Sequence, residues 1–160
     1  MLEYKVSVVT GEMTRGGTMD NVFITLIGSE GESERTLLNQ GRDFASNQPD
    51  KEYTVKTEAS LGKILLIGLE KEQFLPFFDD DWFCCKVVVK TPDSEELHFP
   101  CYCWIKERQL VYVREGTAVT ILKETNSMLK KCRELELMER QASYQWRETA
   151  KGLPHTFECR

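Results

Sequence analysis

The chain has 160 residues, a formal net charge of −5, and hydrophobic and aromatic shares of 41% and 10%. This length suits one ordinary domain with a short appendage, and the hydrophobic share is too high for a disordered chain. No run approaches the roughly 20 apolar residues of a membrane span, and the N-terminal apolar run is too short for a signal peptide, so we expect a cytoplasmic protein.

Charge is distributed unevenly along the chain. Residues 1–122 contain 13 basic and 20 acidic side chains, for a net charge of −7, whereas residues 123–160 have a net charge of +2. An acidic surface of this kind argues against nucleic acid as a partner. It should also be repelled by an anionic membrane unless a cation intervenes.

The first part of the chain predicts a series of short strands. In YKVSVVT, the side chains of Tyr4, Val6 and Val8 alternate with polar ones, which is the periodicity of a half-buried strand. Further strand-like segments follow between turn-rich stretches: NVFITLIG, SERTLLN, EYTVKTEA, KILLIGLE, WFCCKVVVKT, ELHFPCYCWI and QLVYVRE. About eight such strands are typical of an antiparallel β-sandwich.

The pattern changes after Gly116, where a helix is expected. One helical stripe gathers five small or apolar side chains: Met128, Cys132, Leu135, Met138 and Ala142. One helix after eight strands does not complete a sandwich. We therefore expect residues 117–160 to be a connection to a further segment, and the chain to be truncated.

Six cysteines occur without any CxxC pair, at positions 84, 85, 101, 103, 132 and 159. A zinc site normally requires closely spaced ligand pairs, so zinc is disfavoured. On a strand, Cys84 and Cys85 point to opposite faces, whereas Cys101 and Cys103 share a face. We interpret these residues as reduced thiols that act as small hydrophobic side chains.

Several strings resemble the N-terminal region of animal lipoxygenases. The most specific is FPCYCWI (99–105), which is similar to that family's Phe-Pro-Cys-Tyr-x-Trp signature. Others occur in the family's order over essentially the whole chain: GGTMDNVFITLIGSEGES, GRDF, DDW, EGTA and RELELMERQASYQW. GRDFA and the FF before DDDW are closer to the epidermis-type lipoxygenases.

The resemblance implies an all-β fold, with residues 1–116 forming an eight-stranded antiparallel PLAT-type β-sandwich. Residues 117–160 would form a C-terminal linker helix and the start of the connection to a catalytic domain that this chain lacks. Lipoxygenase iron is held by several histidines and a carboxylate, and here only His98 and His155 occur. We therefore expect no enzymatic activity from this chain, whereas its parent would be an oxidoreductase, either a dioxygenase or a hydroperoxide isomerase.

FLPFFDDDWF (74–83) places three adjacent aspartates among aromatic residues, and Pro76 argues for a loop. Calcium takes six to eight oxygen ligands, and in the resembled family the loops at one tip of the sandwich supply them. Carried over by position, the resemblance implies these candidates: Gly17, Thr18, Asp20, Asp43, Asp80 and Asp81. The alternative is that the aspartates only form turn hydrogen bonds or remain solvated.

Three positions near these candidates depart from the pattern of calcium-responsive relatives. Met19 and Ala45 stand where an acid is common, and Arg42 stands where an amide is common. Loss of two acidic ligands and gain of a cation should weaken calcium binding. Calcium is therefore expected to be at most a weak cofactor.

Apolar side chains near the aspartates are expected to dock into a membrane interface, where tryptophan in particular is favoured. The candidates are Leu75, Phe77, Phe78 and Trp104, with Arg15 favouring anionic headgroups. In the alternative, Trp82 or Phe83 lies in the core and Trp104 packs against the linker helix or the catalytic domain. These readings give two functions: a peripheral lipid-binding regulatory module assisted by calcium, or a calcium-independent protein-interaction module that stabilises the catalytic domain.

Overall fold

The structure is a computed structural model, and it describes residues 1–38, 44, 51–74, 80–117, 119–120, 122–147, 151–152 and 156–159. Its contacts divide the chain into two compact units, Met1–Thr117 and Ala118–Arg160. The expectation that the second unit leads into a catalytic domain stays a prediction.

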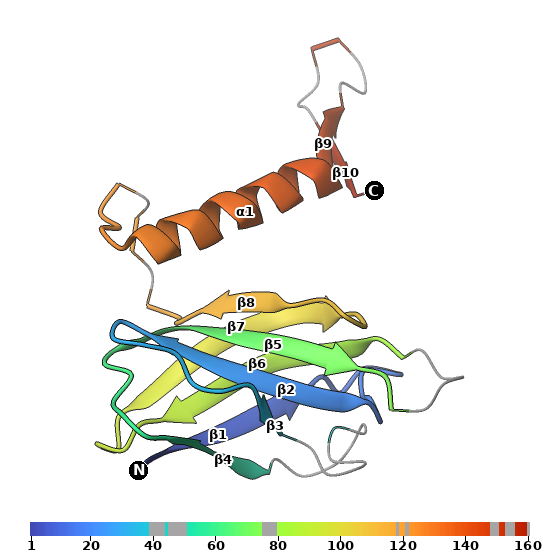
Figure 1. Cartoon of the computed structure of the whole chain (residues 1–160). Helices are drawn as coiled ribbons and strands as arrows, with labels where there is room; N and C mark the ends of the chain where they lie inside the picture. Colours follow the sequence, from blue (N-terminus) through green and yellow to red (C-terminus); the bar gives the residue numbers. More distant parts are fainter. Residues whose placement is uncertain are drawn as a thin grey trace. The chain divides into compact units, whose positions relative to one another are not determined.

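The first unit is a β-sandwich of two four-stranded antiparallel sheets (Figure 1). One sheet has the order β4-β1-β6-β7, from β4 (Glu52–Thr57), β1 (Leu2–Thr10), β6 (Trp82–Lys90) and β7 (Glu96–Ile105). The other has the order β3-β2-β5-β8, from β3 (Thr36–Leu37), β2 (Asn21–Gly28), β5 (Ile64–Glu72) and β8 (Val111–Arg114). The predicted fold class is confirmed.

Alternating side chains of both sheets fill the space between them. Tyr4, Val6 and Val8 of β1 are buried, as their spacing predicts, while β5 is buried along most of its length because it is a central strand. Trp82 is fully buried, and its indole N–H donates to the Thr10 hydroxyl at 3.0 Å. The alternative that Trp82 is a core residue is therefore correct.

The cysteines of β6 and β7 lie beside this core. Cys84 is buried, and Cys101 and Cys103 are half-buried and pack against the same hydrophobic cluster. Burial and contact with these thiols raise the pKa of the Cys84 thiol; the hydrogen bond with Cys101 is the largest cause. Cys84 is therefore an unreactive neutral thiol, in keeping with its interpretation as a small hydrophobic residue.

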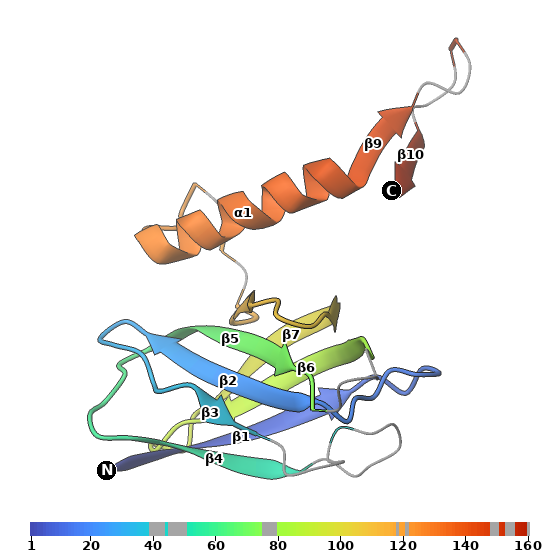
Figure 2. The same ribbon diagram turned by 45° about the vertical axis from the view of Figure 1, so that its right-hand side comes forward.

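Strand direction brings several connections to one end of the sandwich (Figure 2). β1, β5 and β7 end there, and β2, β6 and β8 begin there, as the registers Thr10↔Cys84, Asn21↔Glu72 and Trp82↔Ile105 require. We call this end of the sandwich the loop end. Backbone hydrogen bonds tie its segments together, with the Phe83 N–H donating to the Gly16 carbonyl at 2.9 Å.

The second unit contains helix α1 (Ser127–Ser143) and a hairpin of β9 (Tyr144–Arg147) and β10 (Thr156–Cys159). The Asn126 side chain caps the helix by accepting hydrogen bonds from two backbone N–H groups of its first turn. On the predicted stripe, Cys132 is buried whereas Met128, Leu135 and Met138 are exposed. No helix in the described part of the chain is both long and apolar enough to cross a membrane.

Candidate functional site

A buried lysine lies at the centre of the loop end. Inward positions of β5 alternate through Ile67 and Leu69 to Lys71, so the Lys71 side chain points between the sheets and is fully buried. Its ammonium donates to Asp20 Oδ2 at 2.8 Å, to Asp80 Oδ1 at 3.3 Å and to the backbone carbonyl of Asp80. An ammonium has three N–H donors, so all three are used.

The two carboxylates are also held by other donors. Asp20 Oδ1 accepts the Phe74 backbone N–H at 2.9 Å. Asp80 accepts the Thr18 hydroxyl on Oδ1 at 2.6 Å and the Met19 backbone N–H on Oδ2 at 3.2 Å. Every oxygen of both carboxylates therefore has a protein donor.

The electrostatics match this arrangement. Burial disfavours the charge on Lys71, but the hydrogen bond and charge of Asp20, followed by those of Asp80, outweigh burial and raise the pKa of Lys71. Burial likewise opposes ionisation of Asp80, but the hydrogen bonds from Thr18 and Met19 and the charge of Lys71 hold its pKa below the ordinary value. Lys71 and Asp80 are consequently charged at neutral pH.

The described calcium candidates do not fit a calcium site. Thr18, Asp20 and Asp80 do come together, but around the Lys71 ammonium, and Asp20 is only 3% exposed. Calcium requires six to eight oxygen ligands, whereas these oxygens already serve other donors. Among the residues that the structure describes, no three His, Cys, Asp or Glu side chains are grouped to hold a metal ion.

The other candidates divide into two groups. Gly17 is half-buried in the same loop, and Asp81 and Arg15 are exposed at the loop end. Four predicted residues lie outside the described residues: Asp43, Leu75, Phe77 and Phe78. The assignment of calcium-binding and membrane-binding roles to these positions stays a prediction.

Apolar side chains are exposed at the loop end around this buried cluster. The exposed fractions are 61% for Phe74, 43% for Met13 and 42% for Trp104. Trp104 packs edge-on against Phe83, with 5.2 Å between ring centroids. Phe74 is fixed by its backbone hydrogen bond to Asp20. The buried charges thus position at least one exposed aromatic residue.

Lys71, Met13 and Phe74 were missed by the sequence analysis. Lys71 was detectable, because counting every second residue from Ile67 places it on the inner face of β5, where an unpaired lysine would be costly. Its partners were not detectable, because Asp20 and Asp80 are 51 and 9 residues away. Phe74 begins the aromatic stretch FLPFFDDDWF, but no periodicity separates it from its neighbours.

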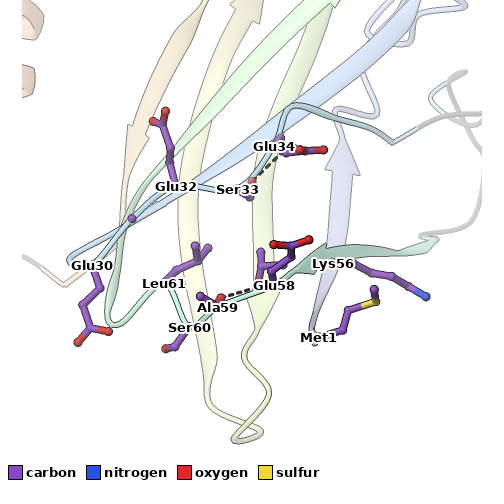
Figure 3. Close-up of a pocket in the computed structure, with 12 residues that line it drawn as sticks. Met1, Glu30, Glu32, Ser33, Glu34, Lys56, Glu58, Ala59, Ser60 and Leu61 are labelled. Atoms are coloured by element: carbon purple, nitrogen blue, oxygen red, sulfur yellow. Dashed lines mark hydrogen bonds between the residues drawn. The ribbon is translucent and has the colours of Figure 1, made fainter.

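A concave region lies at the end of the sandwich opposite the loop end. Figure 3 shows this pocket of about 390 Å³, which is formed where β2 and β4 end and β1 begins. Its charged lining residues are Glu30, Glu32, Glu34, Glu58 and Lys56. Four carboxylates and one ammonium would repel a fatty acid or a lipid phosphate, so this pocket does not suit an anionic ligand.

Comparison with known proteins identifies the first unit. Residues 4–114 match the model of the PLAT/LH2 domain, which accounts for the two sheets and the loop end described above. The chain belongs to the PLAT/LH2 domain family. The predicted resemblance to an animal lipoxygenase PLAT domain of the epidermis type is confirmed.

Two curated relatives illustrate this similarity. The PLAT chain is 44% identical to the hydroperoxide isomerase ALOXE3 of Mus musculus over 155 residues, covering 96% of this chain and 22% of that protein. It is 33% identical to the polyunsaturated fatty acid (12S)/(13S)-lipoxygenase, epidermal-type, of Mus musculus, again covering 96% and 22%. The chain thus spans about a fifth of the length of these relatives.

A solved structure of coral 8R-lipoxygenase has the same fold. It superposes with a TM-score of 0.82 at 26% sequence identity, covering 98% of this chain and 23% of that one. That protein is described as undergoing calcium activation through a C2-like domain. We call Lys71, Asp20, Asp80 and Thr18 the Lys71 cluster. Its contacts raise the question of whether the loop end of this PLAT domain uses the metal.

Proposed function

We propose that this chain is the membrane-docking regulatory module of a lipoxygenase-type oxidoreductase, associating peripherally with lipid. The observation that carries the proposal is the exposure of Met13, Phe74 and Trp104 together at the loop end. The oxidative chemistry, with its iron and fatty-acid substrate, would belong to a catalytic domain of the same polypeptide. The similarity to a hydroperoxide isomerase and to lipoxygenases supports that assignment.

The physical basis of docking is burial of these side chains in the membrane interface. Full burial of one large apolar side chain is worth about 1.5–3 kcal/mol, so two or three partly exposed ones give reversible attachment. Trp104 suits the interface because its ring is apolar while its N–H stays hydrated. The exposed Arg15 would add attraction to anionic headgroups.

Calcium assistance is not part of this proposal, because the described carboxylates do not fit the metal. The sequence prediction of calcium-assisted docking depends on Asp43, outside the described residues, and on the exposed Asp81. It is tested separately, by comparing docking in calcium with docking in a chelator.

Co-sedimentation with phosphatidylcholine vesicles, with and without phosphatidylserine, tests the docking proposal. Phe74→Ser and Trp104→Ser should each reduce the vesicle-bound fraction several-fold. Leu135→Ser in α1, where a side chain of similar exposure is changed in the other unit, should leave it unchanged. Equal binding by all three variants, or no binding by the unmodified chain, would refute membrane docking through the loop end.

A second candidate function is contact with the catalytic domain through the outer face of the β3-β2-β5-β8 sheet. Leu110 and Tyr112 are both 44% exposed and lie next to Gly68. Together these three residues form an apolar patch on this face. If this patch faces a partner domain, Tyr112→Ser should lower the stability of a full-length protein but leave vesicle binding by this chain unchanged.

A further inference from the structure

We propose that the Lys71 ammonium is the resident cation of the loop end. It connects β5 with two segments, the one that precedes β2 and the one that precedes β6. It takes the place that calcium would otherwise fill. The inference concerns how the loop end is assembled and does not depend on membrane docking.

The Lys71 ammonium lies between the two sheets. Lys71 belongs to β5 of one sheet, whereas Asp80 lies two residues before β6 of the other sheet. Asp20 directly precedes β2. One cation therefore bridges three separate segments of the loop end, which is the structural role of a bound metal ion in a loop cluster.

The hydrogen-bonding groups of the cluster are also satisfied. Besides Lys71, the carboxylate oxygens accept hydrogen bonds from the Thr18 hydroxyl and from the backbone N–H groups of Met19 and Phe74, all within 3.2 Å. No buried side-chain nitrogen or oxygen in the described part of the chain lacks a hydrogen-bond partner. The cluster is therefore satisfied without an added ion.

Calcium would compete with the ammonium for the same oxygens. Calcium binds carboxylate oxygens at about 2.3–2.6 Å. An ion on Asp20 Oδ2 would lie within about 5 Å of the ammonium, which is itself 2.8 Å from that oxygen, so the two cations would repel. Calcium bound there would have to displace the Lys71 side chain, which is fully buried.

The test is thermal unfolding of the chain in 2 mM calcium chloride and in a chelator, with magnesium as the ionic control. This calcium concentration is above the dissociation constants of extracellular calcium modules, which are about 10⁻⁴–10⁻³ M. The unmodified chain should unfold at the same temperature, within about 1 °C, in all three conditions. A calcium-specific rise of several degrees would overturn the proposal.

Lys71→Gln removes the cation and leaves the two carboxylates facing each other. In chelator its melting temperature should fall by about 10 °C, and calcium, but not magnesium, should restore part of this loss. Lys71→Arg keeps the charge and should stay insensitive to calcium. A folded Lys71→Gln variant with no calcium response would show that Lys71 does not substitute for the metal.

Calorimetric titration of the unmodified chain covers the case in which Lys71→Gln does not fold. Absence of calcium-binding heat would support the resident-cation proposal. Stoichiometric calcium binding that is lost in Asp80→Asn would overturn it.

Discussion

Asp20→Asn tests the energetic reasoning for the loop end most directly, because it removes one charge and almost no volume. The Asp20 carboxylate serves two donors on separate oxygens, Lys71 Nζ at 2.8 Å and the Phe74 N–H at 2.9 Å. An asparagine has one carbonyl oxygen, so its NH₂ group must face one of these donors. The variant leaves the buried ammonium with Asp80 as its remaining described carboxylate partner.

Removing one partner of a buried ion pair lowers the free energy of unfolding by about 3–5 kcal/mol. Because Asp80 still pairs with the ammonium, we expect a loss at the lower end, about 3 kcal/mol. Urea unfolding at neutral pH, followed by tryptophan fluorescence, measures this difference. Asp81→Asn is the matched control, because the same chemical change at an exposed side chain should alter stability by less than about 0.5 kcal/mol. Equal effects of the two substitutions would refute a structural role for the Lys71 cluster.

Three further outcomes follow from particular contacts. The pKa of Asp80 is lowered in the folded chain, so the stabilisation by its charged form is full above about pH 4 and is lost as the pH falls through the folded pKa. Asp80→Asn should therefore reduce the loss of stability between neutral pH and pH 3, as measured by urea unfolding. Gly28→Ala would place a Cβ 2.0 Å from a backbone carbonyl oxygen and should destabilise the sandwich by more than about 2 kcal/mol, whereas a Cβ at Gly31 meets nothing within 4 Å and Gly31→Ala should be nearly neutral in thermal unfolding. Asn126→Ala removes the cap of α1 and should cost the helix about 1 kcal/mol, measured by faster amide hydrogen exchange in its first turns; unchanged exchange would contradict the capping role.

The β-sandwich was predictable from local residue patterns. Period-two alternation in β1 and the continuous apolar run of β5 are local patterns, and each has one energetically acceptable arrangement when two sheets share a core. The family motifs added the PLAT assignment. The hairpin of β9 and β10 was not predicted, because its strands have four residues each and carry too little periodicity to distinguish them from a helix end.

The contacts of Asp20 and Asp80 with Lys71 depend on the tertiary structure. The sequence showed carboxylates in loops near aromatic residues, a pattern whose spacing favours turn hydrogen bonds and whose family resemblance favours a calcium site. The difference lies in Lys71, whose charge reaches Asp20 and Asp80 only after β5 has paired with β2 and the two sheets have closed. A buried ion pair depends on distances between residues far apart in the chain, and no local pattern of residue types encodes those distances.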